Sequence, residues 1–243
     1  PPIAVIWGWQ AASVAAGLSC ILLAILMQPI RARFDSDRVP EQRLHWGDAI
    51  GTLTNVLRDN TLRPMAAAGF AFIGLQAVFT TFTVTYLFEV VGQTVETAGS
   101  VFGLAMTVAI PARIAWGWVA SGRVTPRLLL AGFGITMFLA VAAMGFMSAD
   151  WPMAGIVAVV LACSATAVSW HGVLLAEVAR IAPEGEVGGV TGGVLAFGNL
   201  GQIALPSLFS ALLLATGDYL TAFALCGLPA AAAGIWLLAG SDS

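Results

Sequence analysis

Residues 65–88 read MAAAGFAFIGLQAVFTTFTVTYLF, a stretch of 24 residues without a charged side chain. The hydrocarbon core of a bilayer is about 30 Å thick, and roughly 20 apolar residues cross it as an α-helix. Uncharged stretches of only about 10–14 residues are typical of buried helices in soluble proteins instead. The sequence therefore predicts that residues 65–88 cross a membrane as a helix.

Six further stretches have a similar length and composition. They lie near residues 9–28, 98–120, 128–148, 152–178, 189–215 and 219–239. Of the 243 residues, 59% are hydrophobic and 9% are charged, against about 25% charged in an ordinary soluble domain. One core of this size cannot hide so large an apolar excess, which excludes a soluble globular protein. We expect an all-α fold, a polytopic membrane helical bundle of seven transmembrane helices.

The ten basic residues are all arginines, and they lie on one side of this seven-span arrangement. The first, third and fifth connections and the end of the third span contain Arg31, Arg33, Arg38, Arg43, Arg58, Arg63, Arg113, Arg123, Arg127 and Arg180. We call this side the Arg-rich end. The positive-inside rule predicts that it is cytoplasmic, so the chain is expected to be a multi-pass protein of the cell (inner) membrane with a cytoplasmic carboxyl terminus. The formal net charge of -3 argues against a nucleic-acid partner, and the lipid bilayer is the expected surrounding.

Polar side chains inside the predicted spans recur with a period of three spans. The first, fourth and seventh spans hold little beyond single Ser or Thr residues, and the others hold amides, hydroxyls, a His and an Arg. The candidates for binding a solute are Gln76, Thr80, Thr83, Thr107, Ser164, Asn199 and Gln202. Amides that are unpaired in hydrocarbon cost several kcal/mol. The pattern leaves two interpretations open, hydrogen bonds between helices or the lining of a water-filled solute path.

The first connection contains a second helical pattern. Between Asp48 and Arg58, apolar residues at helical spacing lie opposite polar ones, which predicts a short amphipathic helix at the membrane interface. Thr61 is then expected to cap the next helix, and Pro64 falls in its first turn.

The end of the third span, residues 111–127, reads PARIAWGWVASGRVTPR. It resembles the short cytoplasmic loop of the major facilitator superfamily, whose signature is G-x-x-x-D-R-x-G-R-R. Gly117 matches the first glycine, and Arg123 and Arg127 match basic positions, while Ser121 stands where the superfamily has Asp.

Two other stretches add to this resemblance. Glu177, Arg180 and Pro183 are similar to the acidic, proline-containing stretch between the tenth and eleventh helices of the superfamily, and Trp7-Gly8-Trp9-Gln10 looks like the start of its sixth helix. The chain as a whole then resembles helices 6–12 of the superfamily fold. This implies three parts: the last helix of the amino-terminal bundle at 1–30, a cytoplasmic central loop at 31–63, and a carboxyl-terminal six-helix bundle at 64–240.

The resemblance implies a secondary active or facilitative transporter that moves a small solute by alternating access. The chain is then expected to be a fragment, whose partner is the missing amino-terminal half of the same transporter. The alternative is a non-transporting membrane sensor or assembly protein on the same fold. An enzyme is not expected, because the sequence has no nucleotide-binding loop, no His/Glu metal pair and no nucleophile beside a base. No catalytic residue, metal site or cofactor is predicted.

Charged residues near the Arg-rich end are candidates for a gate. The resemblance implies that Arg113 and Glu177 pair when the cavity is closed to the cytoplasm, with Arg123, Arg127 and Arg180 nearby. The other interpretation of these residues is anchoring at the interface, with long side chains reaching toward water.

His171 in the fifth span is a candidate for proton coupling. A lone His that follows a Trp, as here, is more often a packed or interfacial residue, and the sequence leaves both interpretations open.

Overall fold

The computed structural model describes residues 2–31, 46–122 and 124–239. Every regular element in these ranges is a helix, so the all-α prediction is confirmed. Seven segments of the described chain are long and apolar enough to cross a membrane, as predicted. The elements are α1 (Pro2–Met27), η1 (Gln28–Ile30), α3 (Trp46–Arg58), α4 (Leu62–Glu89), α5 (Val95–Ala120), α6 (Pro126–Gly145), α7 (Met153–Ala167), α8 (His171–Ile181), α9 (Val187–Thr216) and α10 (Tyr219–Ala239).

The structure divides into two units between His45 and Trp46. The first unit contains α1 and η1, and α1 is kinked at Gly8, whose φ of 83° lies in the left-handed region. The second unit contains α3 to α10. The predicted amphipathic helix is present as α3 and belongs to this second unit, where Val56 is buried beside Gly193 of α9.

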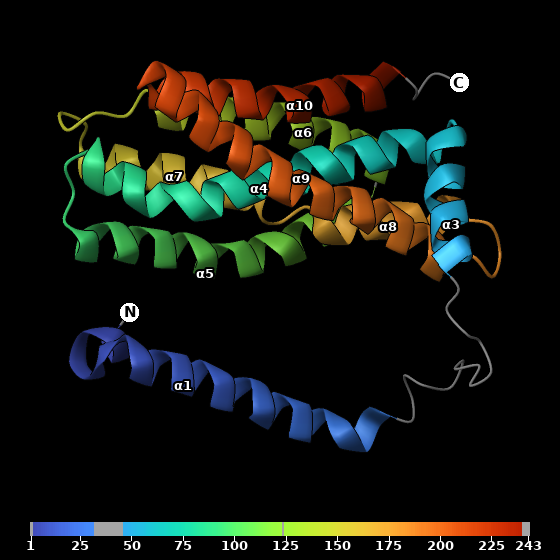
Figure 1. The fold of residues 1–243 in the computed structure, drawn as a ribbon, viewed down its shortest axis with the longest axis horizontal. Coiled ribbons are helices and arrows are strands. Elements are labelled where there is room, and N and C mark those ends of the chain that lie inside the picture. The colour runs from blue at the N-terminus through green and yellow to red at the C-terminus, as the bar shows by residue number, and fades with distance from the viewer. Residues whose placement is uncertain (1, 32–45, 123, 240–243) are drawn as a thin grey trace. The chain divides into compact units, whose positions relative to one another are not determined.

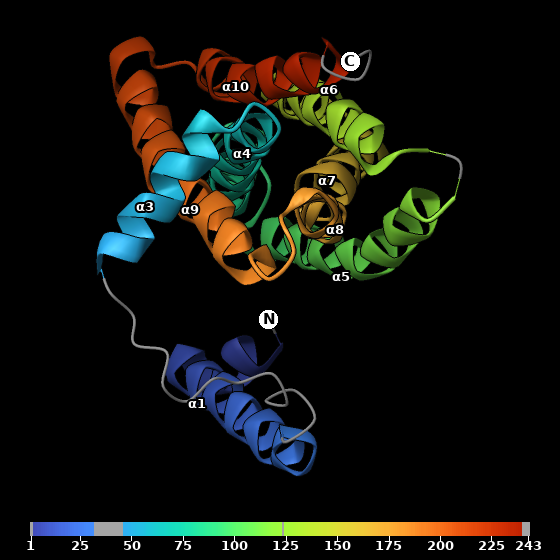
Figure 2. The same cartoon turned by 90° about the vertical axis from the view of Figure 1, so that its right-hand side faces the viewer.

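Two pairs of helices in the second unit approach so closely that their backbones touch. In the α4–α9 pair, a Cβ added to Gly74 would lie 2.7 Å from the carbonyl oxygen of Gly201, and one added to Gly201 would overlap the carbonyl of Phe70. In the α6–α10 pair, a Cβ added to Gly134 would lie 2.9 Å from the nitrogen of Gly234. Figures 1 and 2 show α4 beside α9 and α6 beside α10. Such small-residue contacts favour helix association in bilayers.

The start of α4 corrects the prediction that Thr61 caps this helix. Thr61 occupies the N-cap position, but its side chain makes no capping hydrogen bond. The carboxylate of Asp59 accepts hydrogen bonds from the backbone N–H groups of Leu62 at 3.0 Å and Thr61 at 2.7 Å. These two hydrogen bonds, of which the one from Leu62 has the larger effect, hold the pKa of Asp59 below its usual range. Asp59 is therefore the residue that satisfies the first amides of the helix.

The fifth span, predicted near residues 152–178, is present but contains an interruption. The helix α7 ends at Ala167 and α8 begins at His171, although both belong to one membrane-crossing segment, Met153–Ile181. The three residues between them include neither Pro nor Gly, so the interruption depends on contacts with other helices.

Candidate functional site

A pocket of about 290 Å³ lies between α4, α8 and α9. It is lined by Ile73, Gln76, Ala77, Thr80, His171, Leu195, Asn199 and Gln202. Four of these residues were predicted to bind a solute, two from α4 and two from α9. The fifth predicted residue is His171, from α8. The structure thus brings candidates from three helices to one place.

The glycine contact between α4 and α9 determines which residues of α9 face this pocket. Gly198 and Gly201 pack against α4. Asn199 and Gln202 each follow one of these glycines by one residue, which turns their side chains about 100° away from the contact. Both amides therefore lie beside the line of contact, where Gln76 of α4 lines the same pocket.

Two polar atoms of the pocket are buried without a hydrogen-bond partner among the described residues. They are Oε1 of Gln76 and Nδ1 of His171. The imidazole of His171 is stacked on the indole of Trp170, with ring centroids 3.9 Å apart and planes 17° apart. A buried polar atom without a partner costs about 1–3 kcal/mol. The pocket therefore offers groups that a hydrogen-bonding ligand would satisfy.

Side chains of α5 stabilise the interruption between α7 and α8. The last carbonyl groups of a helix have no partner within it, and in hydrocarbon there is no water to replace that partner. Nε1 of Trp116 donates to the carbonyl of Ala165 at 2.8 Å. Nε and Nη2 of Arg113 donate to the carbonyl of Val168 at 3.2 and 3.1 Å. Arg113 is thus bonded to the backbone of the interruption and not to Glu177.

Two residues of the interruption add hydrogen bonds of their own. Ser169 Oγ donates to the carbonyl of Ala109 on α5 at 3.2 Å, and Nε1 of Trp170 donates to the carbonyl of Ala167 at 3.0 Å. Trp170 is fully buried. These contacts fix the point at which α8 begins, and hence the position of His171, its first residue.

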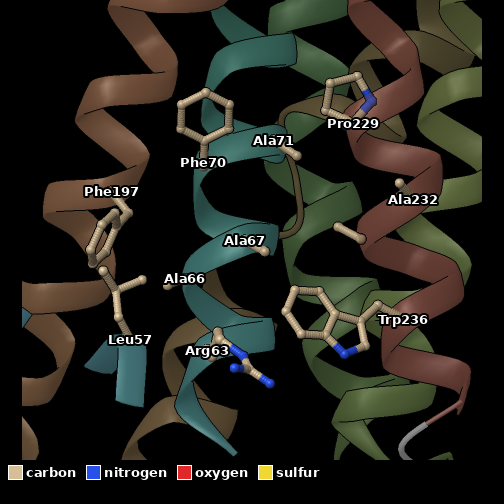
Figure 3. A pocket seen from close by; sticks show the side chains of 11 residues that line it. Leu57, Arg63, Ala66, Ala67, Phe70, Ala71, Phe197, Pro229, Ala232 and Trp236 are labelled. Carbon is tan, nitrogen blue, oxygen red and sulfur yellow. The ribbon is translucent and has the colours of Figure 1, made fainter. Parts of the chain in front are cut away.

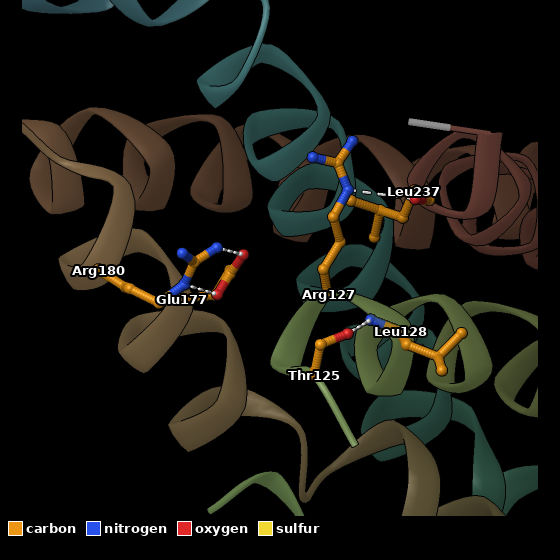
Figure 4. A network of polar contacts seen from close by, with 6 residues as sticks. All are labelled: Thr125, Arg127, Leu128, Glu177, Arg180 and Leu237. Atoms are coloured by element: carbon orange, nitrogen blue, oxygen red, sulfur yellow. Dashed lines mark hydrogen bonds and ion pairs between the residues drawn. The ribbon is translucent and has the colours of Figure 1, made fainter. Parts of the chain in front are cut away.

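The candidate gate residues make separate contacts near the Arg-rich end. Arg180 donates to both carboxylate oxygens of Glu177, from Nε at 2.8 Å and from Nη2 at 2.7 Å (Figure 4). The Glu177 side chain is 1% exposed and the Arg180 side chain 65% exposed. Arg127 donates from Nε to the carbonyl of Leu237 at 3.2 Å, which joins α6 to the end of α10. Arg123 lies outside the described residues.

A sequence model of the Major Facilitator Superfamily matches residues 2–177, which is more than half of the chain. The chain belongs to the Major Facilitator Superfamily. With seven segments able to cross a membrane, it is a membrane transporter of this superfamily type. The match includes residues 111–127, on which the resemblance was based. No curated protein sequence matches the chain closely enough to be compared with it.

Three of the solute-binding candidates in this superfamily member lie away from the pocket. Thr83 is buried and donates to the carbonyl of Phe79 in its own helix at 2.5 Å. Ser164 is buried and donates to the carbonyl of Ala105 at 2.6 Å, which links α7 to α5. Thr107 is exposed on α5 and donates within its own helix at 2.9 Å.

Trp116 and Ser169 were not predicted as site residues. The available signal was the i, i+3 spacing of Arg113 and Trp116, which places both side chains on one face of the third span. For Ser169 there was no signal beyond its polarity, because its acceptor, Ala109, belongs to another helix.

Proposed function

We propose that this transporter carries a small polar solute by alternating access, and that the pocket between α4, α8 and α9 is part of the solute path. The observation that carries the proposal is the convergence of Gln76, His171, Asn199 and Gln202 on one pocket in which two polar atoms lack a protein partner. In this proposal the amino-terminal six-helix half of the same transporter supplies the opposing wall, and the Arg-rich end faces the cytoplasm. The unpaired Oε1 of Gln76 is an acceptor, which favours a solute that carries hydroxyl or amino donors.

The hydrogen bonds of the bundle support a solute path over an interhelical role for the pocket amides. Polar side chains that join helices here are paired with another helix, as Ser164 and Ser169 are with carbonyls of α5. Within the described part of the chain, no hydrogen bond joins Gln76 Oε1 to any group. A residue whose role is to join helices would have its acceptor paired.

We propose an exchange of arginine partners at Glu177 as the gate at the Arg-rich end. A buried carboxylate that loses its cation costs about 3–5 kcal/mol, so Glu177 needs a replacement whenever Arg180 leaves it. Arg113 on α5 and Arg127 on α6 belong to helices that pack against α8. Either arginine would serve as the second partner when Arg180 leaves Glu177.

We propose His171 as the residue that couples transport to protons, if the solute moves against its gradient. Among the described residues lining this pocket, His171 is the one that gains a proton near neutral pH in ordinary proteins. Its Nδ1 has no protein partner, and its ring is held in place by Trp170. A proton and a solute would therefore both bind to the side chain of His171.

Transport assays on the complete transporter test the pocket. Gln76→Ala and Asn199→Ala should raise the solute concentration for half-maximal transport by about 2- to 13-fold, as expected for one neutral hydrogen bond. Thr136→Ala is the matched control, because Thr136 is exposed on α6 and bonds within its own helix. The amount of folded protein should be unchanged in all three variants. If the two pocket variants only reduce this amount and transport per folded molecule is normal, the proposed path is wrong.

A second assay tests the role of His171. His171→Gln keeps the approximate size and hydrogen-bonding capacity of the side chain but cannot be charged. Uptake driven by a pH gradient should be lost in this variant, whereas exchange of solute without a gradient should persist. Gradient-driven uptake at the wild-type rate would assign the coupling to another residue.

A further inference from the structure

A second pocket, of about 450 Å³, lies between α3, α4, α9 and α10, and the proposed solute path does not use it. Figure 3 shows that Phe70 and Phe197 lie along one side of this pocket and Trp236 along the other, with alanines of α4 between them. Leu57 of α3 lies at one end. The pocket is an apolar groove, and we call it the alanine groove.

One end of the alanine groove is cationic. The guanidinium carbon of Arg63 lies 5.4 Å from the centre of the Trp236 ring, a cation–π geometry. Figure 3 shows Arg63 at this end of the groove, and Phe70 and Pro229 at the other. The carboxylate of Asp59, near in sequence, is bonded to backbone amides at the start of α4. The groove therefore combines one charged end with an apolar length.

The length of the groove fits one leaflet of a bilayer. Between Arg63 and Phe70 the helix α4 rises about 10 Å, at 1.5 Å per residue. Half of the hydrocarbon core is about 15 Å thick. Arg63 belongs to the Arg-rich end, and tryptophans such as Trp236 are enriched at the membrane interface. The groove thus runs from the interface at Arg63 toward the middle of the bilayer.

We propose that the alanine groove binds one anionic phospholipid, with an acyl chain along the alanines and the phosphate at Arg63. Charge complementarity selects this occupant, because the phosphate of an anionic lipid meets Arg63 without the additional cation of a zwitterionic headgroup. A polar solute would find no amide or hydroxyl side chain among the residues that line the groove. Basic pockets between transmembrane helices on the cytoplasmic side bind anionic headgroups in this manner.

Native mass spectrometry of the full 243-residue chain in detergent tests the proposal. Dioleoyl phosphatidylglycerol is the anionic probe, and dioleoyl phosphatidylcholine is the zwitterionic one. The wild-type chain should retain phosphatidylglycerol more tightly. Arg63→Gln should weaken its retention about fivefold, the effect of one basic residue at a membrane surface, and weaken that of phosphatidylcholine less. Ala67→Phe should fill the groove and weaken the retention of both lipids.

Two matched controls separate the groove from the rest of the surface. Arg58→Gln removes an exposed arginine of α3 that does not line the groove, and Gly132→Phe adds a ring on α6 where no atom lies within 4 Å of an added Cβ. Both variants should retain phosphatidylglycerol as the wild type does. Equal losses in Arg58→Gln and Arg63→Gln would overturn the proposal, and so would unchanged retention in Arg63→Gln. Arg63 is exposed, so its variant should fold, as circular dichroism would show.

Discussion

The contact between α4 and α9 at Gly201 makes a sharp prediction about stability. In Gly201→Ala, the new methyl group would overlap the carbonyl group of Phe70. This neighbour is backbone, so no side-chain rotation relieves the overlap. Gly74 faces the same contact, because a Cβ there would lie 2.7 Å from the carbonyl oxygen of Gly201. The two helices must therefore move apart in the variant.

The magnitude follows from the opposing effects of the added methyl group. Overpacking a tight contact destabilises a protein by about 1–3 kcal/mol, and replacing Gly by Ala within a helix stabilises it by up to about 1 kcal/mol. Gly192→Ala is the matched control in the same helix, because an added Cβ meets nothing within 4 Å there. Its free energy of unfolding should rise slightly. The gain from replacing Gly by Ala is common to both variants, so they should differ by the overpacking cost alone, about 1–3 kcal/mol, or roughly 5- to 160-fold in the unfolding equilibrium.

The assay is unfolding of the purified chain by a denaturing detergent, followed by circular dichroism and tryptophan fluorescence. Gly201→Ala should unfold at a lower mole fraction of that detergent than the wild type, and Gly192→Ala at the same or a higher one. Because Gln202 follows Gly201 directly, Gly201→Ala should also weaken solute binding in the complete transporter. Equal stability of the two variants would refute the argument that the α4 and α9 backbones touch at Gly201.

Three further predictions use the same purified chain or membranes that contain it. Arg113→Met leaves the Val168 carbonyl without its donor, so the free energy of unfolding should fall by about 1–3 kcal/mol, and Arg113→Lys should recover part of it. The depressed pKa of Asp59 stabilises the folded state at neutral pH, and this stabilisation is lost as pH falls through that pKa. Asp59→Asn should therefore flatten the dependence of the unfolding midpoint on pH below about 5. Thr94→Cys should react with an impermeant maleimide only from the face opposite the Arg-rich end.

The sequence could predict those parts of the fold that depend on composition and periodicity. Long uncharged stretches predicted seven spans. The spacing of Gln76 and Thr80, four residues apart, and of Asn199 and Gln202, three apart, places each pair on one face of its helix. That the two faces meet at one pocket could not be read from spacing alone. The two faces meet because Gly201 of α9 packs against Phe70 of α4, a residue far away in the sequence.

The interruption of the fifth span could not be predicted, because its cause lies in another helix. Val168, Ser169 and Trp170 are not the residues that usually break helices. The freed carbonyls accept hydrogen bonds from Arg113 and Trp116, which lie 55 and 49 positions from these acceptors in the sequence. The helix propensities of residues 168–170 are compatible with a continuous helix here, whereas hydrogen bonds from α5 favour two shorter helices.

The α4–α9 pair lines two different environments, the apolar alanine groove and the polar pocket. Its polar residues therefore stood out in a chain that is otherwise apolar. Phe70 and Phe197 line the alanine groove, whereas Gln76 and Asn199 line the polar pocket. The glycine contact centred on Gly201, which we call the seam, lies in the same pair of helices and positions residues of both sites. Lipid solvates apolar surface without cost, and polar groups are therefore retained only where they serve a pairing or a ligand. A substitution at the seam should consequently disturb lipid retention and solute binding together, whereas Arg63→Gln should disturb lipid retention alone.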